Sequence, residues 1–286
     1  MTDNIHYNVS FTSVVFTKRS YLSKFIFILV LVLISLPGLS KETAETYLFG
    51  VFPHVPKSKL YDMYSPVAKD FQQKLQRKVS VHTKSSYTEF ESTLAVELYD
   101  FALIQPFNYP EAHDRYNYLP LARRSDMLSA LLVVKKDSAY QKLKDLKGKV
   151  IASTARTAAV SRLIESEMIS AGFDPDEDFS RVFKNNHFSC MQTVLIGMAD
   201  GCSTSHRALD HYYQVKLKDR FRIIHESKKI PHVLYIVHKR VPEEDRNILR
   251  KTILNWQNTP TGKKILEKSK MSYFSEAIDE EYNVLR

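Results

Sequence analysis

Two short polar turns hold side chains whose types suit the binding of an anion. Residues 153–157 follow one apolar run and residues 185–187 follow another, and each turn precedes a helical pattern. A helix N-terminus offers free N–H groups and the positive end of its dipole. A guanidinium or imidazole beside it adds further donors. Arg156, Thr157 and His187 are therefore candidate ligand-binding residues.

The elements that position these turns follow the same order twice. Short strands are predicted at 149–152, 182–183 and 201–204, with amphipathic helices between them. Alternation of strand and helix is typical of a parallel sheet with crossover helices. Ligands of such sheets bind outside the carboxyl ends of the strands, which is where both turns lie.

The first half of the chain has the same organisation. Strands are predicted at 47–52, 79–82 and 101–104, and Ser86 with Glu89 forms a capping box at the start of the second helix. An aromatic polar loop, 105–109, follows the third strand. This half therefore also predicts an α/β layer with polar residues at its strand ends.

The order of the elements predicts two α/β lobes. We expect an export signal at 1–40, a first part of lobe 1 at 41–134, an inserted lobe 2 at 135–230, and a return to lobe 1 with C-terminal helices at 231–286. The chain would cross between lobes near 132–134 and 231–234. Two crossings make a hinge, and the strand ends would face a shared cleft.

The N-terminus has the pattern of a secretory signal. Three basic residues precede the apolar run 25–36, and small residues follow it at 37–40. This pattern predicts export to the periplasm with cleavage, and an uncleaved membrane anchor is the alternative. We expect the mature chain to be a soluble monomer.

Composition and motifs exclude several functions. The net charge is +9 over 286 residues, but no arginine-rich arm or zinc-finger spacing is present, so nucleic acid is not an expected partner. No motif predicts a metal or cofactor site.

Cys190 and Cys202 form a disulfide or remain two buried thiols. Cys190 with His187 is the one pair that would suit thiol catalysis, and we expect no enzymatic activity.

Several segments together resemble the periplasmic phosphonate-, phosphite- and phosphate-binding proteins (PhnD type) of ABC importers. They are Phe49–Pro53, Phe101–Tyr109, Asp145–Lys149, Ala171–Pro175 and His187–Asp200. The resemblance implies a two-lobed, type II-like periplasmic-binding-protein fold that closes on its ligand.

The resemblance also implies ligand residues. Tyr109 matches the tyrosine of the family's Gly-Pro-Phe-Ser-Tyr loop, with Gln105 in place of its glycine, and His187 matches a histidine. Tyr87 lies where the family often places an aromatic residue. The family's Ser-Thr-Ser-Gly-Tyr anion clamp corresponds to residues 157–161, where two of the three hydroxyls are absent.

These observations predict a solute-binding protein that captures a small anion, phosphonate-like or another oxyanion, for a membrane ABC permease. Because hydroxyl donors are missing, a singly charged or bulkier anion should bind better than a bare phosphonate dianion. The alternative is a periplasmic sensor input of the same fold that partners a membrane histidine kinase.

Overall fold

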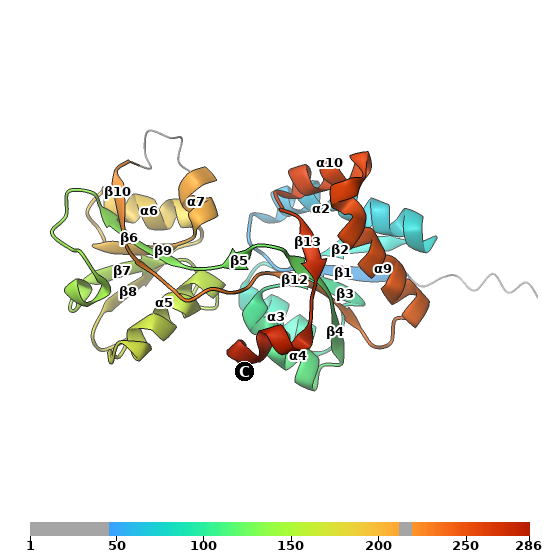
Figure 1. Ribbon diagram of the computed structural model, residues 1–286, viewed down its shortest axis with the longest axis horizontal. Coiled ribbons are helices and arrows are strands. Elements are labelled where there is room, and N and C mark those ends of the chain that lie inside the picture. The colour runs from blue at the N-terminus through green and yellow to red at the C-terminus, as the bar shows by residue number, and fades with distance from the viewer. Residues whose placement is uncertain (1–45, 212–218) are drawn as a thin grey trace, which may run out of the picture. The chain divides into compact units, whose positions relative to one another are not determined.

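The computed structural model describes residues 46–211 and 219–286, so the predicted export signal at 1–40 lies outside the described residues. Figure 1 shows two groups of strands, each flanked by helices. No helix within the described ranges is long and apolar enough to cross a membrane.

Six strands form the first sheet, in the order β13-β4-β12-β3-β1-β2. They are β1 (Tyr47–Val51), β2 (Val79–His82), β3 (Phe101–Ile104), β4 (Tyr118–Arg124), β12 (Leu234–His238) and β13 (Phe274–Glu276). β1 pairs in parallel with β2 and β3, and β12 runs antiparallel between β3 and β4. The associated helices are α2 (Lys57–Leu75), α3 (Tyr87–Ala95), α4 (Tyr109–Arg115), α9 (Glu243–Asn255) and α10 (Pro260–Ser269).

Aromatic side chains fill the core of the first sheet. The Phe49 ring stacks on Phe101 and Tyr235 at centroid distances of 5.5 and 6.0 Å. Gly50 is required beside them, because a Cβ there would lie 2.6 Å from the Tyr99 ring. Burial of these rings stabilises this lobe.

Five strands form the second sheet, in the order β10-β6-β9-β7-β8. They are β6 (Leu131–Lys135), β7 (Val150–Ser153), β8 (Ser180–Phe183), β9 (Gly201–Thr204) and β10 (Phe221–Glu226), with α5 (Ala159–Ser170), α6 (His187–Leu195) and α7 (His206–His211). β7 is parallel to β8 and β9, as the alternation predicts, whereas β6 is antiparallel to its neighbours. Short 3₁₀ turns complete the described chain at Pro106–Asn108, Leu143–Leu146, Trp256–Asn258 and Asp279–Leu285.

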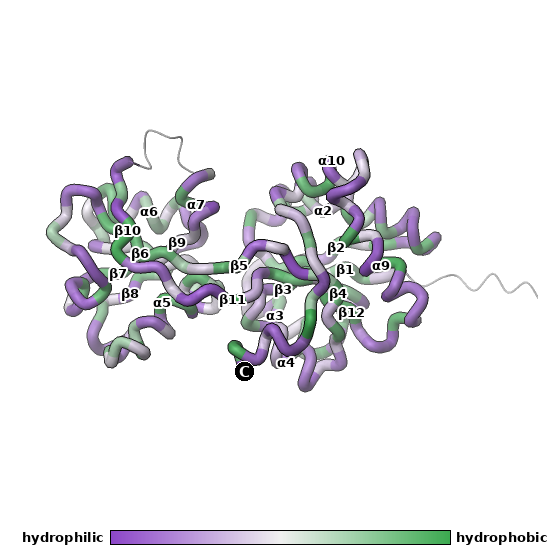
Figure 2. The backbone as a smooth tube through the Cα atoms, viewed as in Figure 1, coloured by the Kyte–Doolittle hydropathy of each residue, from purple (hydrophilic) through white to green (hydrophobic). Residues whose placement is uncertain are grey.

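Alternation along β6 explains why helices cover both faces of the second sheet. Leu132 and Val134 pack with the residues of α5, and Leu131 and Val133 pack with those of α6. Successive strand residues point to opposite faces, so an unbroken apolar strand is buried on both sides. Figure 2 shows hydrophobic residues along these central strands.

A short antiparallel ribbon joins the two sheets. β5 (Met127–Leu128) pairs with β11 (Ile230–Pro231). The sequence predicts a crossing near 132–134, with the lobe boundary after 134. In the structure the chain leaves the ribbon near 130, and β6 already belongs to the second sheet. The first crossing thus lies a few residues earlier than expected, because the apolar run continues from ribbon to strand without a sequence break.

The two cysteines form a disulfide. Cys190 on α6 and Cys202 on β9 have Cα atoms 5.8 Å apart, within the range that a disulfide spans. Packed layers of secondary structure usually lie about 10 Å apart. Because α6 packs directly against β9, the Cα atoms of the two cysteines lie closer than that. The structure therefore selects the disulfide over two thiols, and it leaves no free thiol for nucleophilic chemistry in the described residues.

Candidate functional site

A cavity of about 320 Å³ lies between the strand ends of the two sheets. Both lobes contribute to its wall, with Phe52 and Tyr87 from the first sheet's side and Thr154 and His187 from the second's. Apolar side chains such as Met63 and Leu128 line much of the remaining wall. The cavity is therefore large and apolar enough to hold more than a bare phosphate.

Cationic side chains dominate the charged groups around the cavity. The described lining includes one carboxylate, Asp126, and four cationic side chains: Lys59, Arg124, Arg207 and Lys270. Such an excess attracts anions from solution and stabilises them in a partly desolvated site.

Arg124 is fixed by its neighbours. Its Nε donates to Asp126 Oδ1 and to Ser272 Oγ, both at 3.0 Å, and only 7% of the residue is exposed. The pair with Asp126 uses one edge of the guanidinium and holds its plane at the cavity wall. Because Arg207 lies on the other lobe, the two arginines approach the cavity from opposite sides.

Three of the four histidines that line the cavity are held in the neutral form. Burial lowers the pKa of His54 and of His187 to about 4, and burial with the nearby Arg124 lowers the pKa of His232. At neutral pH each ring therefore carries one N–H and one acceptor nitrogen.

Hydrogen bonds fix two of the three tautomers. The backbone N–H of Val233 donates to His232 Nδ1 at 2.7 Å, so the single proton of His232 is on Nε2. His54 has the opposite tautomer, with its proton on Nδ1, because Nδ1 donates to the Phe52 carbonyl at 3.0 Å. His232 is therefore a neutral N–H donor at the cavity, and His54 is not.

Two of the predicted ligand residues line this cavity. Tyr87 is the first residue of α3, and Ser86 caps that helix by accepting from Glu89 N–H at 3.2 Å, as the capping box predicts. His187 is the first residue of α6, and its Nδ1 lies 3.0 Å from Thr204 Oγ1. Their placement is compatible with the predicted roles, and contact with a ligand stays a prediction.

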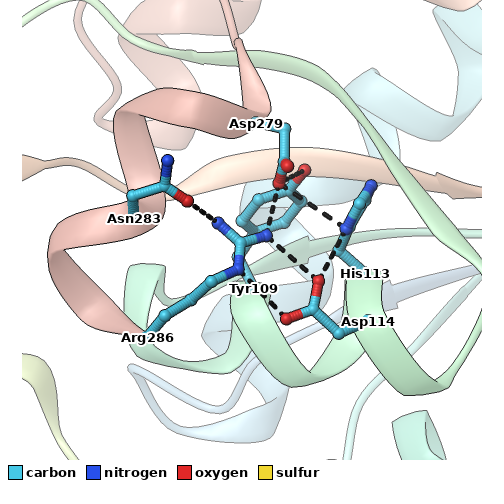
Figure 3. Close-up of polar contacts among 6 residues, drawn as sticks. All are labelled: Tyr109, His113, Asp114, Asp279, Asn283 and Arg286. Carbon is cyan, nitrogen blue, oxygen red and sulfur yellow. Dashed lines mark hydrogen bonds and ion pairs between the residues drawn. The ribbon is translucent and has the colours of Figure 1, made fainter.

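Tyr109 lies elsewhere. Its side chain is fully buried, its hydroxyl donates to Asp279 Oδ1 at 2.9 Å, and its ring packs on Tyr282. Figure 3 shows the surrounding ion pairs, in which Arg286 bridges Asp279 and Asp114. Tyr109 thus anchors the C-terminal 3₁₀ turn to α4, and it is absent from the cavity's described lining.

Arg156 and Thr157 also lie outside that lining. The Arg156 guanidinium contacts Asp176 at 2.6 Å and Glu165 at 3.6 Å, and about half of the side chain is exposed. Both residues line a separate depression with Phe107. The placement differs from the prediction because α5 begins only at Ala159, so the preceding turn directs Arg156 toward the acidic side chains.

A family model described as the periplasmic substrate-binding protein of a phosphonate ABC transporter matches residues 49–282. The chain belongs to this family. Members are periplasmic components that work with ABC permeases, and no curated protein matches the chain.

Three solved structures illustrate the shared two-lobed fold. A phosphonate ABC transporter component from Pseudomonas aeruginosa is 19% identical, with a TM-score of 0.71 over 84% of this chain and 83% of that one. A Xanthomonas citri protein bound to ATP is 16% identical, at 0.73 over 84% and 94%. PhnD1 of Prochlorococcus marinus, in complex with methylphosphonate, is 16% identical, at 0.73 over 85% and 96%.

Several cavity residues escape sequence reasoning. In the sequence, Arg123 and Arg124 are typical of two adjacent charges on the surface. In the structure Arg123 pairs with Glu281, whereas Arg124 is buried and pairs with Asp126. Arg207 and His232 belong to no motif. The usable signal is their position just after a strand, with Arg207 following β9 and His232 following the ribbon strand β11.

Proposed function

We propose that this family member captures a small organic anion or oxyanion in the cavity and delivers it to an inner-membrane ABC permease. The observation that carries the proposal is the charge of the lining, four cations against one carboxylate among the described residues. Arg124, Arg207 and the Nε2–H of His232 would supply the donors.

Transport by this mechanism needs reversible closure. The β5–β11 ribbon is the narrow connection between the sheets, and an anion that contacts arginines of both lobes would favour the closed form. The proposal includes export through the segment 1–40 and action as a monomer.

A thermal-shift screen tests ligand capture. Phosphate, phosphite, alkylphosphonates, arylphosphonates and sulfonates are the probes, and a ligand at 100 times its Kd adds about 2.7 kcal/mol to the free energy of unfolding. If none of these anions raises the melting temperature, the proposal fails.

A matched pair of variants then locates the site. Arg207→Gln should lower the affinity for the best anion about tenfold or more, the scale of one charge-assisted hydrogen bond. Arg156→Gln should change it less than about twofold, because Arg156 is paired with Asp176 outside the cavity. The reverse result would restore the predicted role of Arg156 and reject the cavity assignment.

The sensor-input alternative predicts the same cavity and a different membrane partner. If a permease and an ATPase are encoded beside this gene, reconstitution with them should give anion-stimulated ATP hydrolysis. A neighbouring histidine kinase, stimulated instead, would favour sensing.

A further inference from the structure

Gln105 connects the two lobes inside the cavity. It directly follows β3 of the first sheet, and only 5% of it is exposed. Its Oε1 accepts a hydrogen bond from the backbone N–H of Ala159 at 2.9 Å, and its Nε2 lies 3.5 Å from the Thr157 carbonyl. Ala159 is the first residue of α5, so the contact joins one lobe's strand end to the other lobe's helix start.

This contact supplies the cap that α5 lacks. Residue Ala158 occupies the N-cap position and has no side-chain acceptor. The first N–H groups of a helix need an outside acceptor, and an anion is the strongest one. Here the acceptor is the amide oxygen of Gln105, a neutral group provided by the chain itself.

The amide also takes up space at the cavity wall. Gln105, Ala158 and Ala159 all line the cavity. An anion oxygen that approached the Ala159 N–H would have to displace the Gln105 side chain and break its hydrogen bond. The remaining strong donors, on Arg124, Arg207 and His232, do not require this displacement.

We infer that Gln105 is a specificity-determining residue that keeps small tetrahedral oxyanions from the α5 N-terminus. The cavity then favours larger organic anions, whose charged end is held by the arginines and whose body packs on the apolar wall. This inference deepens the proposed function and rests on it.

Calorimetry on wild type and Gln105→Ala tests the inference, with methylphosphonate and phenylphosphonate as probes. Removing the side chain exposes the Ala159 N–H, so methylphosphonate affinity should rise about tenfold or more, and phenylphosphonate affinity should change less than about threefold. Gln105→Glu keeps the acceptor and adds a negative charge, so it should lower the affinity for both probes. Circular dichroism confirms that the variants are folded.

The outcomes separate the two claims. Binding of either probe to wild type decides the proposed function. Unchanged or weaker methylphosphonate binding by folded Gln105→Ala overturns the inference, whether or not wild type binds, and so does an equal gain for both probes. A gain in methylphosphonate binding confined to Gln105→Ala supports it.

Discussion

Removal of the disulfide should destabilise the second lobe by about 3 kcal/mol. Cys190 and Cys202 are separated by 12 residues in the sequence, and for a loop of this size the chain-entropy relation gives a value near 3 kcal/mol at 25 °C. Both cysteines are fully buried, so the double variant Cys190→Ala/Cys202→Ala avoids leaving an unpaired hydroxyl in the core.

Urea denaturation followed with two probes measures the loss of stability and assigns it to one lobe. The single tryptophan, Trp256, packs in the core of the first lobe, so its fluorescence reports that lobe. Far-UV circular dichroism reports both lobes. The dichroism transition of the double variant should move to lower urea, and fluorescence should follow only if the lobes unfold together.

The wild-type protein with a reducing agent is the control, since it opens the same loop without removing the sulfur atoms. Identical dichroism midpoints for oxidised wild type, reduced wild type and double variant would refute the loop-entropy reasoning.

Three other changes have expected outcomes. Because burial lowers the pKa of His54 and His187 to about 4, below the ordinary value of about 6.5, the unfolded chain binds more protons between these values. Stability should therefore fall as pH drops from about 6.5 to 4, by at most about 1.4 kcal/mol per histidine per pH unit, and a His187→Phe denaturation series should show a smaller slope. Tyr109→Phe should cost about 1 kcal/mol in urea unfolding, with anion affinity unchanged, since its hydroxyl holds a carboxylate outside the cavity. Gly50→Ala should lower the melting temperature by several degrees, because its Cβ would overlap the Tyr99 ring.

The sequence predicts the layers of this protein better than the directions of its side chains. Apolar runs and turn residues define β1, β3 and β7 closely, because burial of a strand depends on local composition. Tyr109 shows the limit of such reasoning. Its loop does follow a strand end, but its hydroxyl partner is 170 positions away at Asp279, and no local pattern reports that contact.

The placement of Arg156 outside the cavity's described lining has a related reason. A turn before a helix predicts an anion site only if the side chain points along the helix axis, and the boundary of α5 decides this. Asp176 and Glu165 also compete for the guanidinium, and they are visible as partners only once the fold is known.

Helix capping accounts for the choice of donors at the cavity. Asn186 caps α6 by accepting from Ser189 N–H at 2.9 Å, as Ser86 caps α3, and Ser205 Oγ accepts from Ala208 N–H at 3.3 Å in α7. Only α5, among these four described helices, is capped from the other lobe, by Gln105.

Capping by the chain's own side chains reduces the number of backbone N–H groups that an anion can use. Recognition at this cavity therefore has to depend more on charged and imidazole side chains than on helix ends. Arg124 and Arg207 approach from opposite lobes, so a ligand that binds both gains most when the lobes are closed. Specificity and closure would then depend on the same contacts, and a variant that weakens binding through Arg207 should also lower the closed fraction at a fixed ligand concentration.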